Sequence, residues 1–304
     1  MLVLPPMPHL RSPSIPLAER QLAPVFELWR RVQAMPPART DAALRVLMAW
    51  LADATDADNV IWIGAVRALA GRAAQRDPFQ GWRLRDRQTL HPDSPEYRRQ
   101  LEHYLSRDHY GKLSSTYYTR SHHEKEDAHV GMAVRQLLAG AGTPQVHRLR
   151  DGWIDFARFR RTTHYQLYYR NVGIVDRLWI CCPVDARCES VFLVDRHRRP
   201  RGAPRRNFSA GDALLAGTAI FGVGALHRWL FLNCGLLVGD KPLSPVETAV
   251  LNGLLTGRTE KEIAAGTGQN PATLHKYVVA LYARYGVTSR AGLMAYWLGQ
   301  DSTV

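Results

Sequence analysis

The chain has 304 residues, 46% of them hydrophobic, and carries a formal net charge of +13. This length leaves room for two domains, and the hydrophobic fraction is high enough for a buried core, which excludes a wholly disordered protein. The longest uncharged apolar stretch, residues 213–226, is shorter than the roughly 18–20 residues of a membrane span, and four cysteines without a secretion signal favour a cytoplasmic protein with reduced thiols.

The first 238 residues contain both helix and strand signals. Residues 1–16 are rich in proline and lack the basic start of a signal peptide, so we expect a disordered tail there. Helices are expected where apolar residues recur at helical spacing, and strands where β-branched and aromatic residues dominate. In chain order, the expected elements are helices at 17–32 and 40–54, strands at 59–66 and 81–85, helices at 94–106 and 126–138, strands at 146–149, 178–183 and 189–195, and a last long helix capped by Ser209 and Asp212.

These elements predict an α+β sensor or dimerisation domain over residues 17–238, with a mostly antiparallel sheet, intervening helices and a closing helix. The segment GIVDRLWICCPVDARCESVFLVDRHRR, followed by FSAGDALLAGTAI, is similar to a GAF-like domain, because two strands joined by a turn precede the closing helix. This resemblance implies a ligand pocket or a dimerising module, and it assigns no ligand-binding residue.

Residues 239–304 are expected to form an all-α domain of four short helices, each with its own start signal. A hydroxyl or amide side chain before a helix accepts a hydrogen bond from the third helical amide, and a glutamate at that third position completes a capping box. The start signals are Ser244 with Glu247, Thr259 with Glu262, Asn270 before Pro271, and Ser289. Glycines suited to ending a helix follow at Gly257 and Gly286.

The third of these helices has one apolar face and one mixed face. The apolar residues recur at helical spacing and are Leu274, Val278, Leu281 and Tyr285. His275, Lys276 and Val279 fall on the other face, which has no carboxylate. Such a face suits a phosphate-lined groove, although most polar helix faces are simply solvated. The short helix and tight turn before it favour a helix-turn-helix over that alternative.

The segment from Leu243 to Tyr296 resembles, without a gap, the LuxR-type (GerE) helix-turn-helix of bacterial transcription regulators. The matching residues are LSPVE at 243–247, Gly257, the KEIA run at 261–264, Gly268, Thr273, Leu281 with Tyr282, Gly286 with Val287, and SRA at 289–291. In that family the third helix enters the major groove. The resemblance therefore implies base-edge roles for His275, Lys276 and Val279, and phosphate contacts for Thr273 and Lys261.

The segment departs from the family pattern at four positions. Thr267 and Gln269 stand where the family usually has apolar residues, which puts the packing of that turn in doubt. His275 replaces a common lysine, and Gly292 replaces a usual glutamate, so the fourth helix lacks a complete capping box. These changes are expected to alter operator preference or stability and to leave the fold intact.

Most of the positive charge lies outside the C-terminal domain. Residues 241–304 contain six basic and four acidic residues, a net charge of +2, so the remainder carries +11. Much of that surplus falls in residues 196–206, which are rich in arginine. This segment is either a solvated loop between a strand and a helix, which is the usual state of a charge run, or an auxiliary contact with phosphate or with an acidic partner.

Three groups of residues in the N-terminal domain are candidate sites of chemistry. The histidines lack the spacing of metal ligands, and we expect them to be solvated or satisfied; they are His103, His109, His122, His123 and His129. The thiols are expected to be buried hydrophobes, with a redox or metal sensor as the alternative; they are Cys181, Cys182, Cys188 and Cys234. The aromatic residues form either a core or a pocket lining; they are Trp153, Phe156, Phe159, Tyr165, Tyr168 and Tyr169.

We therefore predict a cytoplasmic, sequence-specific transcription regulator that is not an enzyme. It would bind double-stranded DNA as a homodimer, respond to a small-molecule effector, and need no cofactor, metal or membrane. The long helix from Ser209 is apolar on more than one face, which predicts dimerisation through Leu226 and Leu230, assisted by Leu293, Tyr296 and Trp297. The alternative is an enzyme or adaptor whose C-terminal unit mediates protein contacts.

Overall fold

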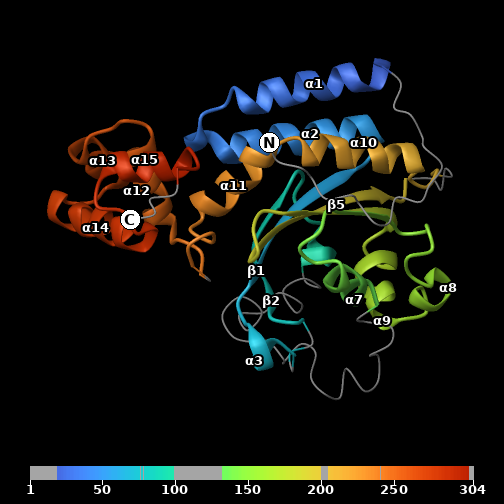
Figure 1. Ribbon diagram of the computed structural model, residues 1–304. Coiled ribbons are helices and arrows are strands. Elements are labelled where there is room, and N and C mark those ends of the chain that lie inside the picture. The colour runs from blue at the N-terminus through green and yellow to red at the C-terminus, as the bar shows by residue number, and fades with distance from the viewer. Residues whose placement is uncertain are drawn as a thin grey trace.

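The computed structural model describes residues 19–75, 77, 79–98, 132–199, 205–239 and 241–300. The expected tail at 1–16 and the five histidines between 103 and 129 lie outside the described residues. The fold is α+β, with an antiparallel sheet between two sets of helices and a separate group of helices at the C-terminus (Figure 1).

The sheet has five antiparallel strands in the order β2-β1-β5-β4-β3. Their bounds are β1 Asn59–Arg67, β2 Trp82–Thr89, β3 Gln145–Arg148, β4 Ile174–Pro183 and β5 Cys188–His197. β1 and β2 lie where strands were expected and pair with each other, while β4 begins four residues before the expected Leu178. β1 and β5 are buried along almost their whole length because helices cover both faces of the sheet.

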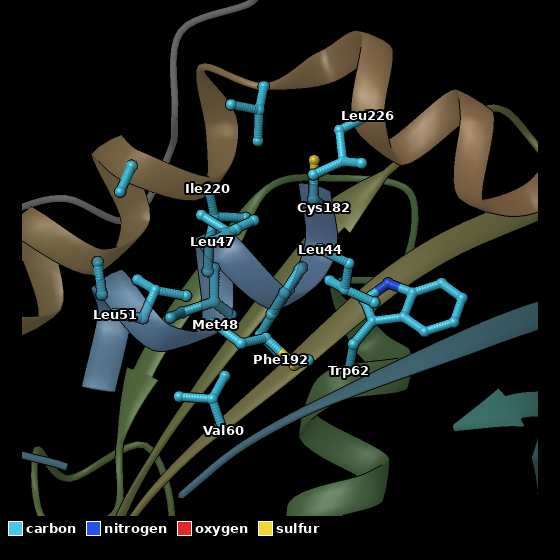
Figure 2. Packing of buried hydrophobic residues seen from close by; sticks show 14 of the residues in the cluster. Leu44, Leu47, Met48, Leu51, Val60, Trp62, Cys182, Phe192, Ile220 and Leu226 are labelled. Carbon is cyan, nitrogen blue, oxygen red and sulfur yellow. The ribbon is translucent and has the colours of Figure 1, made fainter. Parts of the chain in front are cut away.

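One face of the sheet carries a layer of helices and the main hydrophobic core. The layer consists of α1 Glu19–Gln33, the 3₁₀ turn η1 Pro37–Arg39, α2 Thr40–Thr55, α10 Ala210–Phe221 and α11 Gly224–Asn233. Figure 2 shows the apolar side of α2, including Leu44 and Leu47, packed onto Trp62 and Phe192 of the sheet. Successive strand residues point to opposite faces, so Val60 joins Trp62 in this core.

The prediction of one long helix after Ser209 is wrong. The segment forms two helices, α10 and α11, which meet at a bend of 62°. The indole of Trp29 occupies the space beside Gly222, where any larger residue would overlap it, and its Nε1 donates to the carbonyl oxygen of Ala219 at 3.0 Å. At the bend, the carbonyl oxygen of Ile220 accepts from the amide of Val223 at 3.3 Å and from Nε2 of His227 at 2.9 Å. Burial lowers the pKa of His227 to about 4, so its other ring nitrogen remains an acceptor for the hydroxyl of Ser190 at 3.2 Å.

No single helix among the described residues is long and apolar enough to cross a membrane, although the bent pair α10 and α11 passes that test together by length and composition. Two further helices were expected over ranges that the structure describes only in part. The first is seen at 95–98, where the amide of Tyr97 donates to Ser94 Oγ at 3.1 Å, and the second is α7 Met132–Ala139.

The opposite face of the sheet is covered by shorter elements: α7, α8 Phe156–Phe159, α9 Thr163–Tyr165 and the short π-helix η2 Gln166–Arg170. Phe159, Tyr168 and Tyr169 are buried there against Trp179 of β4, as expected of a core. Trp153, Phe156 and Tyr165 are only partly buried at its margin. The C-terminal helices are α12 Pro245–Leu255, α13 Glu260–Thr267, α14 Pro271–Tyr285 and α15 Arg290–Trp297.

Candidate nucleic-acid interface

All four C-terminal helices begin at the residues predicted from the sequence. Ser244 and Thr259 each form a complete capping box, with Glu247 and Glu262 respectively. Asn270 Oδ1 accepts from the amide of Thr273 at 2.8 Å, and Ser289 Oγ accepts from the amide of Gly292 at 3.1 Å. An N-cap satisfies the free amides of the first helical turn and so fixes the residue at which a helix begins. The caps therefore define the first residues of α13 and α14, and with them the length of the turn between the two helices.

The turn between α13 and α14 tolerates its polar residues. Gly268 has a φ of +66°, the left-handed conformation that lets the chain leave α13. The hydroxyl of Thr267 donates to the carbonyl oxygen of Ile263 at 2.8 Å, within its own helix. The amide of Gln269 donates to the carbonyl oxygen of Ala264 at 3.0 Å. The turn therefore closes through local hydrogen bonds, and the apolar residues usual at these two positions are not required for it.

Helix α14 presents three of the predicted contact residues to solvent. Leu274, Val278, Leu281 and Tyr285 are buried in the C-terminal core, as the spacing predicts. His275, Lys276 and Val279 are exposed, and Val279 has an exposed fraction of 52% although its side chain is aliphatic. Thr273 is partly buried beside the N-cap of α14, and Lys261 is exposed on α13.

A carboxylate from the neighbouring helix lies at this face, which was not predicted. Glu260 Oε2 of α13 is 3.1 Å from His275 Nδ1 of α14. The residues of α14 itself include no carboxylate on this face, as expected. The folded surface does include one, because Glu260 of α13 lies beside it. No spacing signal in the sequence marks this pair, because its residues lie in different helices on either side of the turn.

The C-terminal helices are attached to α11 rather than tethered by a free linker. Tyr285 Oη donates to the carbonyl oxygen of Leu232 at 2.5 Å, and Trp229 Nε1 donates to the carbonyl oxygen of Trp297 at 3.3 Å. The guanidinium of Arg228 donates to the carbonyl oxygen of Tyr296 at 3.3 Å and lies over its ring. Leu232 is fully buried in the C-terminal core, so the two parts of the chain share apolar packing.

The prediction that Leu226 and Leu230 of α11 form a dimer surface is wrong. Leu226 and Leu230 belong to the main core, with exposed fractions of 1% and 3%, and the surplus apolar face covers the C-terminal helices of the same chain. Leu293 and Trp297 are likewise buried in the C-terminal core. The inference failed because the second surface that an all-round apolar helix requires was supplied within the chain.

The arginine-rich segment is neither a simple solvated loop nor a row of free cations. Arg196 is fully buried and donates to the carbonyl oxygens of Thr55, Asp56 and Arg206. Arg205 pairs with Asp58 at 2.5 Å. The remaining described arginines differ in their contacts: Arg199 pairs with Asp56, Arg206 with Asp212, and Arg198 is exposed; Arg201 lies outside the described residues.

These ion pairs attach the segment after β5 to the turn between α2 and β1. Burial alone would raise the pKa of Asp58, but hydrogen bonds from the amide of His197 and from Arg205 lower it below its ordinary value. Arg196 and Arg205 are therefore structural, whereas Arg198, Arg199 and Arg206 remain exposed. An auxiliary phosphate contact through these exposed arginines stays a prediction.

The thiols are poor nucleophiles in this fold. Cys181, Cys182 and Cys188 are buried, as expected. The neighbouring thiols Cys181 and Cys182 point to opposite faces of β4, and both are covered because helices pack on both faces of the sheet (Figure 1). Burial raises the pKa of Cys182 and of Cys188 to about 12, with a smaller contribution from nearby carboxylates. Among the described residues, no group of three or more histidine, cysteine or acidic side chains is placed to hold a metal ion.

A buried ion pair lies among the aromatic residues of the second sheet face. Arg177 Nε is 2.5 Å from Asp195 Oδ1, and its guanidinium also contacts Tyr169 Oη at 3.2 Å. On the same face of β5, Glu189 is buried and its Oε1 has no hydrogen-bond partner among the described residues. Burial raises the pKa of this carboxyl to about 7.

No protein-family model matches the chain, and no curated protein matches it. Among solved structures, SdiA in complex with octanoyl-rac-glycerol is 12% identical, with 94% of this chain and 97% of that chain covered and a TM-score of 0.43. A crystal structure of Escherichia coli SdiA is 13% identical, with 92% and 98% covered and a TM-score of 0.41.

Proposed function

We propose that the chain is a sequence-specific DNA-binding regulator of transcription whose helix α14 enters the major groove. The observation that carries this proposal is the exposed row of His275, Lys276 and Val279 on a capped helix that follows a tight turn. Lys276 supplies donors for guanine N7 and O6, and an exposed valine suits the methyl group of thymine. An aliphatic side chain held in water gains nothing from folding, whereas it gains contact area in a groove.

The proposal is tested by selecting sites for the full chain from a random pool of duplex DNA, followed by titration of single variants. Lys276→Ala should weaken binding to the selected site by about 1–3 kcal/mol, since a base contact is lost. Lys261→Ala should weaken all sequences alike and reduce the salt dependence, as a phosphate contact does. Arg45→Ala is the matched control, because this exposed cation lies on α2. A pool that yields no preferred sequence would contradict the proposal and favour a protein-contact role for the C-terminal unit.

We also propose that the regulator binds as a homodimer through α15. Met294 of this helix and Leu298, which follows its last residue and donates its amide to the carbonyl oxygen of Met294 at 3.2 Å, have exposed fractions of 44% and 74%. Large apolar side chains that are exposed together mark contact surfaces in soluble proteins. A two-fold dimer would place two copies of α14 on two related half-sites of the operator.

The N-terminal domain is proposed to bind a small-molecule effector on the sheet face that carries the aromatic cluster. The Arg177–Asp195 ion pair lies beside the aromatic cluster, and Asp195 also lines a pocket with Tyr97, Val172 and Ile174, which gives the mixed polar and apolar composition of ligand pockets. The resemblance of this domain to GAF-like domains stays a prediction. Thermal unfolding of the unmodified chain and of Tyr97→Ala with a panel of polar and amine-bearing metabolites tests the site, because a ligand bound there should raise the melting temperature of the unmodified chain more.

A further inference from the structure

The contact between Glu260 and His275 places a negative charge beside a predicted base-reading residue. Glu260 is the first residue of α13, and the capping box there uses Thr259 and Glu262, so the Glu260 carboxylate is not part of the cap. It extends instead to the next helix, where its Oε2 lies 3.1 Å from His275 Nδ1. The positive end of the helix dipole stabilises an ionised carboxylate at this position.

The chemistry of this contact assigns one role to each ring nitrogen. A carboxylate oxygen only accepts hydrogen bonds, so Nδ1 of His275 carries the proton and donates it. In a neutral imidazole the other nitrogen, Nε2, then has a free lone pair and acts as an acceptor. Lys276, the next residue, has only donors. The exposed face of α14 therefore offers an acceptor and a donor on adjacent residues.

We propose that Glu260 is a positioning residue that makes His275 a reader of exocyclic amino groups, namely N4 of cytosine or N6 of adenine. In the major groove only these two groups donate hydrogen bonds, whereas guanine and thymine present acceptors. The inference rests on the proposed function of α14. It adds the base class that one position of the operator must contain, and it names the residue in another helix that sets this preference.

The test is site selection at pH 8, well above the ordinary imidazole pKa of about 6.5, with the full chain and five variants. The unmodified chain should select cytosine or adenine at one position of each half-site. Glu260→Ala frees the ring to rotate and to exchange tautomers, so the preference at that position should fall about three- to tenfold, while other positions keep theirs. Glu260→Gln retains an oxygen acceptor for Nδ1 and should keep part of the preference.

His275→Ala should abolish the preference at the same position, and adding Glu260→Ala to it should change nothing further there, since the two residues act through one contact. Thr256→Ala, an exposed residue at the end of α12, is the matched control. A uniform loss of affinity for all sequences in Glu260→Ala, with the helix content intact by circular dichroism, would overturn the inference, as would an unchanged base preference. Failure of the unmodified chain to select any site would instead reject the proposed function itself.

Discussion

The indole Nε1 of Trp297, in the last helix, donates a hydrogen bond of 3.0 Å to Oδ1 of Asn233, the last residue of α11. The amide nitrogen of the same Asn233 donates to the carbonyl oxygen of Pro37 at 2.8 Å and to Thr40 Oγ1 at 2.7 Å. One side chain thus joins α15, α11 and the start of α2. Replacement of Asn233 removes the acceptor of the Trp297 indole, whereas Thr40 Oγ1 still donates to the carbonyl oxygen of Pro37 at 2.5 Å.

Asn233→Ala should loosen the junction between the sheet domain and the C-terminal helices. Loss of these hydrogen bonds is expected to cost about 1–3 kcal/mol, because the indole of Trp297 is largely buried and would lose its acceptor. Amide hydrogen exchange should increase in α15 and around η1 while the central strands stay protected. Gln300→Ala, an exposed residue just beyond α15, is the control. Unchanged exchange in both regions would show that apolar packing alone holds the junction.

Arg196→Leu should destabilise the sheet domain strongly. The substitution leaves Asp212 and three carbonyl oxygens without their buried cationic donor, and breaking a buried pair in this way costs about 3–5 kcal/mol. Arg198→Gln changes an exposed arginine of the same segment and should stay within about 0.5 kcal/mol. Urea unfolding followed by tryptophan fluorescence measures both, and equal midpoints for the two variants would contradict the buried role of Arg196.

Glu189 should make the stability of the domain fall as the pH rises. Burial raises the pKa of this carboxyl from its ordinary value of 4.5 to about 7 in the folded chain, so between these two pH values the folded state binds more protons than the unfolded state. The contribution of Glu189 to the free energy of unfolding is therefore greatest below pH 4.5. It decreases as the pH rises to about 7 and is constant above that pH. Glu189→Gln should raise stability at pH 8 by on the order of 3 kcal/mol and flatten this dependence. An identical pH profile in the variant would indicate that the carboxylate has a partner in solution.

The thiols should react slowly with alkylating reagents while the chain is folded. Burial and nearby carboxylates raise the pKa of Cys182 and Cys188 to about 12, and the thiolate is the reactive form. Iodoacetamide labelling at pH 8, followed by mass spectrometry, should therefore become much faster after denaturation in urea. Rapid labelling of one thiol in the native protein would restore the redox-sensor alternative.

Met294→Ser combined with Leu298→Ser should yield monomers that remain folded, because both side chains are exposed. Leu226→Glu and Leu230→Glu should instead unfold the domain, since they insert charges into the main core. Light scattering and circular dichroism separate the two results. A chain that is monomeric at micromolar concentration, both free and bound to DNA, would contradict the dimer.

The features that could be predicted from the sequence depend on neighbouring residues. The capping boxes at Ser244, Thr259 and Ser209 were identified because each is complete within four residues and satisfies free helix amides locally. Strand positions followed from runs of β-branched and aromatic residues. The exposed residues of α14 followed from the helical period once its apolar face was known.

The features that were missed depend on residues far apart in the chain. The bend between α10 and α11 requires Trp29, which contacts a residue 190 positions later. Arg205 is neutralised by a carboxylate 147 residues away, so its local charge run was misleading. The pair of Glu260 and His275 spans 15 residues across a turn whose exact geometry decides which side chains meet.

The order of the strands also determines when the sheet can form during synthesis. Trp62 of β1 donates to Ser190 of β5, 128 residues later in the chain. At a synthesis rate of about 5–20 residues per second, β1 waits roughly 6–25 s for this partner. Its run VIWIGAV has high β-propensity and no charge, which is the composition of aggregation-prone segments. The C-terminal helices contact mostly residues close in sequence and have no such delay. Newly made chains are therefore most exposed to misassembly, and to capture by chaperones, at β1.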